Sequence, residues 1–504
     1  MENNNGLIEL PDYNYDNSDN EEMFKDKIES KIIENEKESD NSNEKKLTSF
    51  QTIFSIWNTM VGSNIVSLPY NVYCAGIIPT IFICILYGYV CYYSGTIYAR
   101  LGKNEDNFCM VTYNYFYYAF GVKYAKAGKY IYIIFELLMN VGAAFIFFLI
   151  INQNLYPCVC FFLRLFDVEL DDNDFTPYFN QFSIIYCALI LCFILFPLTI
   201  LKEMRILTKI SAYGVYFVSF LLFFVIYTGF ASLAKDSFRI EYKENIEGNK
   251  VRNIFLFGKN IGLLAGNISV GFFSHAVIIP IMKKNKNQEK NKRDLFLAFL
   301  FVVVTYIVIG IFGYIGFSGS DFKSNYEKNW FRFFKSDNIF ILILRIFSVF
   351  QLISIFPLIL FVDRTTIFTN FFRSYIDKLK PIIIFSIIAL LLCILILYFF
   401  YDLLPELIGF IGAGSAIILV YSFPPICNMI DYYIKHKQKD EIKKLKKEKL
   451  LTTININEED VVNLIRWKAN LFYISMILII ILGILTLILQ IAPINFFNIN
   501  IEKN

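Results

Sequence analysis

Residues 56–69, which read IWNTMVGSNIVSLP, form the stretch that decides the fold of this chain. They lie inside an apolar segment, yet they include two Asn, one Thr, two Ser, one Gly and one Pro. Lipid cannot hydrogen-bond an irregular backbone, so a helix break at membrane depth is tolerated only where it lines a cavity. We therefore predict a broken transmembrane helix that contributes to a binding site. The alternative is a helix-packing face of small residues, although two Asn are costly to bury for packing alone.

Residues 262–280, which read GLLAGNISVGFFSHAVIIP, repeat this pattern five spans further along. Two interrupted helices at this separation suggest two inverted repeats, each beginning with a broken helix. The freed N–H groups of one half-helix face an anionic group, and freed carbonyl groups face a cation. Because an amino acid carries both charges close together, it suits such a pair of breaks.

The composition places the chain in a lipid bilayer. Of its 504 residues, 56% are hydrophobic and 18% are charged, whereas soluble proteins carry about a quarter charged residues. Apolar stretches of about twenty residues, each long enough to cross the bilayer core, recur along the chain. We place them near residues 50–71, 77–99, 128–156, 182–201, 208–233, 255–281, 295–317, 338–362, 381–401, 405–431 and 468–491. The expected fold is an all-α polytopic membrane protein with about eleven transmembrane helices.

Several functional classes are excluded by what the sequence lacks. The net charge is +3 and no basic stripe stands outside the short loops, which argues against a nucleic-acid partner. With two His, no metal-ligand cluster and no phosphate-binding loop, we expect no catalytic residue, no metal, no other cofactor and no enzyme activity. A channel would need a ring of charge or filter carbonyls. We expect a monomer whose partners are the bilayer and a small ligand.

The chain divides into a polar tail and an apolar body. Lys and Arg collect in alternate loops, and this asymmetry predicts a cytoplasmic N-terminus. We expect a disordered cytoplasmic acidic tail (1–46), a transmembrane domain (47–492) with inverted repeats at about 50–233 and 255–431, an additional helix (468–491) and a short non-cytoplasmic tail (493–504).

Five motifs occur in an order and spacing that resemble one known family. They are Trp57–Ser63 with Leu68-Pro69; Leu138–Ala143; Gly271–His275 with Pro280, Gly313-Tyr314 and Phe317; Leu344-Arg345 through Pro357 to Arg364; and Leu407–Ala413. The chain thereby resembles the amino acid/auxin permease family, which includes sodium-coupled neutral amino acid transporters and lysosomal members. The resemblance implies a five-plus-five inverted-repeat, LeuT-like core with one extra helix. It also implies a secondary transporter that moves amino acids by alternating access, in a plasma membrane or a vacuolar or lysosomal membrane.

The same resemblance implies which residues bind the substrate. The residues that would surround the substrate carboxylate and amine are Thr59, Met60, Gly62, Ser63 and Asn64. The backbone at Phe272 and Phe273 would complete the amine cage.

The coupling ion is where the sequence departs from the family pattern. In sodium-coupled relatives an Asn of the first span, matched by Asn58, and a Thr of the eighth span hold the ion, but alignment on the nearby Pro and Arg places Ile355 at the Thr position. An alkyl chain cannot bind sodium, and Ser354 lies about 100° round the helix, so it restores the site only if the register slips. We therefore expect a coupling proton or uncoupled exchange rather than sodium.

Three ionisable side chains inside the predicted spans are further ion-coupling candidates. Glu136 is an acid inside the third span, where it either carries a transported proton or is a neutral, hydrogen-bonded or snorkelling carboxyl. Lys209 either snorkels to the cytoplasm or replaces a missing sodium ion with its ammonium group. His275 belongs to the sixth-span break and is either a polar wall or a titrating group.

A second function remains open at this point. A nutrient sensor that binds an amino acid and signals through its cytoplasmic tail would share these membrane features.

Overall fold

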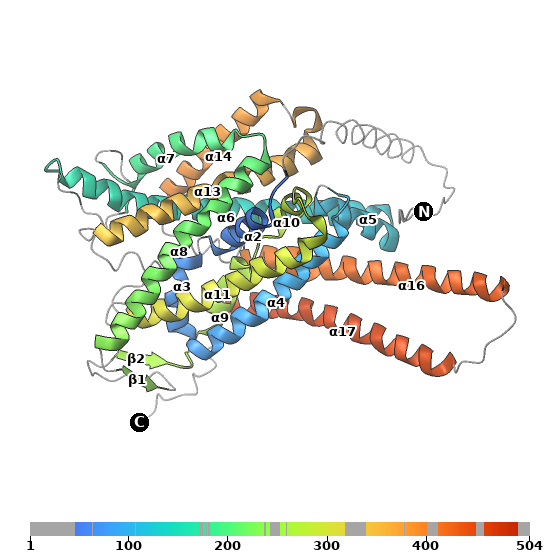
Figure 1. The fold of residues 1–504 in the computed structure, drawn as a ribbon. Coiled ribbons are helices and arrows are strands. Elements are labelled where there is room, and N and C mark those ends of the chain that lie inside the picture. The colour runs from blue at the N-terminus through green and yellow to red at the C-terminus, as the bar shows by residue number, and fades with distance from the viewer. Residues whose placement is uncertain are drawn as a thin grey trace. The chain divides into compact units, whose positions relative to one another are not determined.

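The structure, a computed structural model, describes most of the chain between residues 46 and 491 (Figure 1). The residues it does not describe within that range are 63, 106, 169, 171–174, 178, 180–181, 236–237, 242–251, 259, 318–338, 377, 401–411 and 450–457. The chain forms two units, Met1–Lys46 and Leu47–Asn504, and the predicted tail therefore lies outside the description except for its last residue.

The described part of the second unit is almost entirely helical. Its helices are α2 (Ser49–Val61), α3 (Asn64–Ala75), α4 (Ile77–Leu101), α5 (Phe108–Phe120), α6 (Val122–Arg164), α7 (Ile184–Thr199), α8 (Met204–Lys235), α9 (Ile261–Gly271), α10 (His275–Lys283), α11 (Asn291–Phe317), α13 (Ile339–Phe371), α14 (Leu379–Phe400), the π-helix η5 (Ile417–Ser422), α16 (Phe423–Lys449) and α17 (Glu458–Ile491), with short 3₁₀ turns η2 (Gln288–Lys290) and η4 (Arg373–Tyr375). Two short strands, β1 (Phe238–Glu241) and β2 (Arg252–Phe255), pair in parallel.

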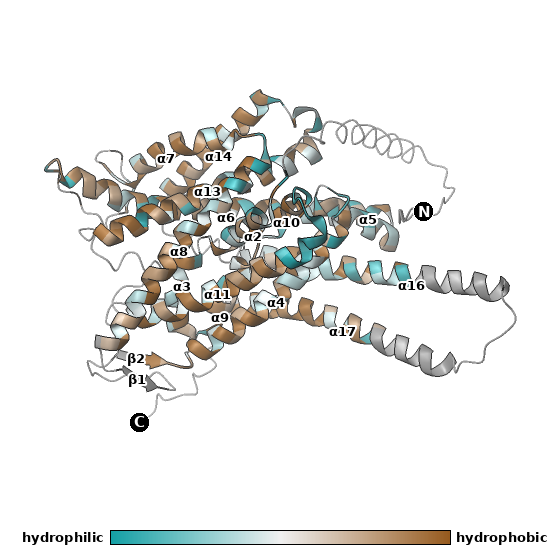
Figure 2. Ribbon diagram, viewed as in Figure 1, coloured by the Kyte–Doolittle hydropathy of each residue, from teal (hydrophilic) through white to brown (hydrophobic). Residues whose placement is uncertain are grey.

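Helices long and apolar enough to cross a membrane dominate this unit. Nine such segments occur in the described part, the pair α9–α10 counting as one, and α7 is a shorter apolar helix. The two halves of the expected first span, α2 and α3, are each too short to be counted alone. Figure 2 shows apolar residues along most of the helices, with polar residues gathered near α10 and along α16. The polytopic α-helical membrane fold is confirmed, while the number of eleven spans stays a prediction.

Two elements differ from the sequence-based expectation. The third span was expected at 128–156, but α6 runs for 43 residues, from Val122 to Arg164. The helix α5 was not expected, because its 13 residues are too few to cross the bilayer core. It begins at Asn107, whose side chain accepts a hydrogen bond from the Cys109 N–H, and it ends at Gly121, where φ is +85°.

The packing of the helices encloses the first span. Helix α2 packs against α8 and α11, and α13 packs against both α6 and α8. Buried apolar side chains of α2, α4, α6, α8, α9, α10 and α11 join in one core cluster. The break between α2 and α3 is therefore held in the interior of the bundle rather than at its lipid-facing surface.

Candidate functional site

The first span is broken where the sequence predicts. Thr48 and Gln51 form a reciprocal capping box at the start of α2, and the helix ends at Gly62. The φ angle of Gly62 is +28°, and a Cβ atom there would lie 2.9 Å from Phe147 Cζ. A side chain at Gly62 would therefore strain the backbone and collide with a ring of α6. Helix α3 resumes at Asn64, and Ser63, between them, lies outside the described residues.

The sixth span is broken in the same way. Helix α9 ends at Gly271 and α10 begins at His275. A Cβ atom on Gly271 would lie 1.7 Å from Asn64 Nδ2, a contact that no side chain can make. A side chain at Gly271 would therefore displace the Asn64 amide and the Tyr306 hydroxyl, which connect the two breaks.

Two side chains connect the breaks. Asn64 Nδ2 donates to the Asn267 carbonyl oxygen at 2.8 Å. The fully buried Tyr306 hydroxyl of α11 lies 2.6 Å from the Met60 carbonyl oxygen and 3.0 Å from the Gly271 carbonyl oxygen, one from each break. Sequence reasoning missed Tyr306, because nothing in the sequence distinguishes it among the 33 Tyr residues of the chain.

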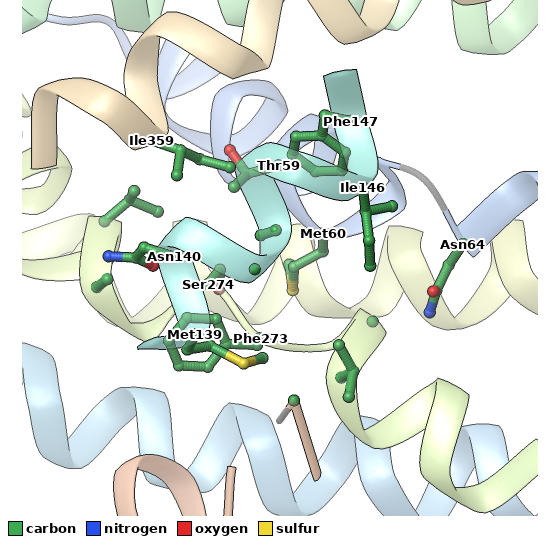
Figure 3. A pocket seen from close by; sticks show the side chains of 17 residues that line it. Thr59, Met60, Asn64, Met139, Asn140, Ile146, Phe147, Phe273, Ser274 and Ile359 are labelled. Carbon is green, nitrogen blue, oxygen red and sulfur yellow. The ribbon is translucent and has the colours of Figure 1, made fainter. Parts of the chain in front are cut away.

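A cavity of about 60 Å³ lies where the two breaks meet α6 and α13. Figure 3 shows the side chains that line it. They are Thr59, Met60, Asn64, Met139, Asn140, Gly142, Ala143, Ile146, Phe147, Val270, Gly271, Phe273, Ser274, Ala276, Val277, Ile359 and Gly412. Residues of both breaks therefore line the cavity, together with a wall from α6 that the sequence analysis did not include.

Four of the predicted substrate-binding residues line this cavity, namely Thr59, Met60, Asn64 and Phe273. Gly62 lies behind Phe147 rather than on the wall itself. Phe272 is fully buried and stacks on Phe299 beside Tyr306, so its ring supports the break from the side away from the cavity.

A second polar cluster surrounds Asn58, which is fully buried. Its Nδ2 atom donates to the Ser211 carbonyl oxygen at 2.8 Å, to Ser211 Oγ at 3.4 Å and to Ser354 Oγ at 3.0 Å. Its Oδ1 atom accepts from Gln351 Nε2 at 3.2 Å. Three oxygens from α8 and α13 therefore converge on one atom of α2.

The expectation that Ser354 reaches Asn58 only if the helix register slips is wrong. Ser354 faces Asn58, whereas Ile355 is fully buried in an apolar cluster with side chains of α6, α7 and α14. On α13 the side chain that contacts Asn58 is therefore that of Ser354 and not that of Ile355.

The remaining candidates lie apart from the Asn58 cluster. Lys209 is half-buried near the start of α8, and Asn58 contacts Ser211 and Gly214 of that helix instead. His275 is buried against the Tyr98 ring, with centroids 5.0 Å apart, and beside Phe273. Glu136 is buried in α6, where it accepts hydrogen bonds from Asn107 and Thr366.

Comparisons with known proteins agree with this architecture. A sequence profile of the family described as transmembrane amino acid transporter protein matches residues 45–458. The chain is similar to neutral amino acid transporter 9 of Danio rerio, with 24% identity over 427 residues that cover 76% of this chain and 75% of that protein. It is also similar to sodium-coupled neutral amino acid symporter 2 of Danio rerio, with 24% identity over 413 residues that cover 79% and 77%.

The fold is also found among solved structures. Mhp1, a nucleobase-cation-symport-1 family transporter, in a closed conformation with bromovinylhydantoin bound, superimposes with a TM-score of 0.53 at 12% identity, covering 89% of this chain and 92% of that one. Such low identity shows the fold alone, and it confirms the expected LeuT-like architecture. The sodium-coupled name of one relative gives no support to the expectation that sodium is the less favoured ion.

Proposed function

The chain belongs to the transmembrane amino acid transporter family, and from this membership we propose that it is a secondary transporter that moves neutral amino acids across a membrane by alternating access. The observation that carries the proposal is the cavity at the meeting point of two helix breaks, one in α2–α3 and one in α9–α10. Backbone groups released by such breaks bind the charged ends of a zwitterion. The neutral class of substrate comes from the names of the relatives.

The cavity walls indicate how a substrate would be oriented. Thr59, Met60 and Asn64 come from the first break, and they would bind the carboxylate and amine together with the backbone near Phe273. The opposite wall, formed by Met139, Ile146 and Phe147, is apolar and would receive an uncharged side chain. A volume of about 60 Å³ is small, so larger substrates require the walls to move apart during the cycle.

Sodium is the coupling ion that the Asn58 cluster supports best. The oxygens of Ser211 and Ser354 converge on Asn58 Nδ2, a donor that carries partial positive charge. If the Asn58 amide turns so that Oδ1 faces these oxygens, the same position becomes a cage of oxygen atoms that suits a hard cation. This proposal replaces the earlier preference for protons at this position, which depended on Ile355.

The cellular setting follows the sequence expectations. We place the N-terminus in the cytoplasm and the protein as a monomer in a plasma membrane or a vacuolar or lysosomal membrane. The alternative, an amino-acid sensor, depends on the tail at residues 1–46, which lies outside the described part except for Lys46.

Transport is tested with the purified protein in liposomes, by uptake of labelled neutral amino acids under an imposed sodium gradient. Uptake should occur in the wild type and fall to background in Gly62→Val, because the new side chain meets Phe147 and strains the first break. Gly414→Val is the matched control, since a Cβ atom there meets nothing within 4 Å. Normal uptake by Gly62→Val would remove the first break from the site.

A further inference from the structure

Two rows of polar side chains face each other between α6 and α13, toward the end of the bundle at which α2 begins. On α6 the row contains Glu136 and Asn140, four residues apart, and on α13 it contains Asp363 and Thr366, three residues apart. Residues at these spacings share one face of a helix. Thr366 Oγ1 lies 3.4 Å from Glu136 Oε2, and the Asn140 amide lies against the Asp363 carboxyl. The two acids therefore sit about one helical turn apart in the same interface.

Both carboxyl groups are buried without a cation among the residues that the structure describes. Glu136 and Asp363 are each 1% exposed. The hydrogen bonds to Glu136 come from Asn107 at 3.3 Å and from Thr366, and both groups are neutral. Among the residues that the structure describes, neither Asp363 oxygen has a hydrogen-bond partner of ordinary geometry. A charged carboxylate in such a place costs several kcal/mol, and two close together repel each other as well.

The basic side chains nearest in sequence do not neutralise this pair. Arg364 follows Asp363, but its guanidinium donates to the carbonyl oxygen of Thr199, the last residue of α7, at 2.9 Å and to the Leu201 carbonyl oxygen at 2.8 Å. Lys129 lies on α6 two turns before Glu136 and is half-buried. The other titratable groups that act on the pair or its neighbours are Tyr98, Glu105, Cys109 and Tyr132. Tyr and Cys side chains are uncharged near neutral pH, so they add no cation.

A further polar atom points to an incomplete site. Asn140 is 5% exposed, and although its amide lies against the Asp363 carboxyl, its Nδ2 atom has no hydrogen-bond partner of ordinary geometry within the described residues. Asn140 also lines the cavity between the helix breaks, and Figure 3 shows its amide nitrogen turned away from Met60 and Phe273. Asn140 therefore stands between the substrate cavity and the Asp363 carboxyl.

We propose that Glu136 and Asp363 form a proton-binding pair that holds one proton in this packed arrangement and releases it to water when α6 and α13 separate. The cavity walls include Asn140 but neither acid. The interface between α6 and α13 can therefore bind a proton but has no room for a hydrated cation. The proton enters from water at the end of the bundle where α2 begins, protonates one carboxylate and leaves by the same reaction in reverse. No other bond is formed or broken.

This pair gives the transporter a sensitivity to pH that is separate from the Asn58 cluster. It rests on the proposed function, because a transporter must open and repack this interface in each cycle. When pH rises at that face, the packed arrangement loses its proton and two like charges oppose it. Uptake should therefore fall as pH rises there, by up to about tenfold per pH unit for one proton.

The test uses the full chain in liposomes with two readouts. The first is the infrared absorption of protonated carboxyl groups at pH 7 without any amino acid present. The second is uptake of labelled leucine, with pH varied at the face where α2 begins. The variants are Glu136→Gln, Asp363→Asn and their combination, and the control is Asp431→Asn, a buried acid that pairs with Arg100 at 3.5 Å and with Lys435 at 2.9 Å.

The proposal expects a protonated-carboxyl signal in the wild type and in the control that disappears in the combined variant. Each single variant should shift that signal, so the single variants test the proposal if the combined variant fails to fold. Uptake should lose its pH dependence in the combined variant and keep it in the control. A wild type without the signal, or a combined variant with unchanged pH dependence, would overturn the proposal. A signal that behaves as expected in a protein that takes up no amino acid would instead contradict transport and leave the proton pair standing.

Discussion

Helix α13 carries two polar clusters that meet opposite conditions. Around Ser354 every participating side chain is neutral and forms at least one hydrogen bond with Asn58, Ser211 or Gln351. Two and a half turns later, Asp363 and its neighbour Glu136 are buried acids with no cation among their described contacts. A satisfied neutral cluster keeps one geometry, whereas an unsatisfied acidic one depends on protons. From this difference we propose that the first cluster fixes position and binds a cation, and that the second responds to pH.

The largest predicted effect comes from displacing the Asn58 side chain from the neutral cluster. A Cβ atom on Gly214 of α8 would lie 2.2 Å from Asn58 Nδ2, so Gly214→Ala must push the amide off Ser211 and Ser354. Losing buried hydrogen bonds costs about 3 kcal/mol in total, which corresponds to about a 100-fold weaker apparent sodium affinity. The measurement is uptake as a function of sodium concentration, with Gly414→Ala as control. An unchanged sodium requirement in Gly214→Ala would separate Asn58 from ion coupling.

Neutralising an acid of the second cluster, which contains Glu136 and Asp363, should stabilise the protein rather than weaken it. Asp363→Asn keeps the shape of the side chain and removes the need for a proton, so at pH 8 it should raise the thermal midpoint by about 2 °C, equivalent to about 1 kcal/mol. At pH 5, where the pair holds its proton, the variant and the wild type should melt together. The check is thermal unfolding in detergent across this pH range.

The control for that experiment is Asp431→Asn, which removes the partner of Arg100 and Lys435. Losing a paired acid should lower the midpoint at both pH values. If Asp363→Asn also lowers it at pH 8, the Asp363 carboxylate has a stabilising partner, and the contrast between the clusters disappears.

The sequence was sufficient for the helix breaks because their residue types are unusual in lipid. The irregular backbone at Gly62 and at Gly271 is costly in lipid unless it lines a cavity, and residues of both breaks, among them Asn64 and Gly271, line one cavity. Glu136 was found for the same reason, since an acid inside an apolar span needs an explanation. Asp363 was not singled out, because it lies just beyond the expected end of the eighth span at residue 362, whereas α13 continues to Phe371.

Contacts between helices were beyond the reach of the sequence. Tyr306 bridges the carbonyl groups of Met60 and Gly271, which are 246 and 35 residues away. No local pattern specifies such a contact, since it arises only when α11 packs against both breaks. The sequence also does not fix which face of a long helix meets its neighbours, because an error of one residue turns the expected face by about 100°.

The smallest expected effect concerns which face of α13 meets Asn58. Ile355 lies in an apolar cluster away from Asn58, so Ile355→Thr should leave the apparent sodium affinity within about twofold of the wild type, although a buried hydroxyl lowers stability by about 1 kcal/mol. Ser354→Ala removes an oxygen that contacts Asn58 and should weaken the affinity by about tenfold, equivalent to about 1.4 kcal/mol. Sodium titration of uptake in both variants measures the difference. If Ile355→Thr strengthens the sodium response while Ser354→Ala leaves it intact, the ion-facing side of α13 is the one that carries Ile355, and the satisfied cluster around Asn58 is a structural contact alone.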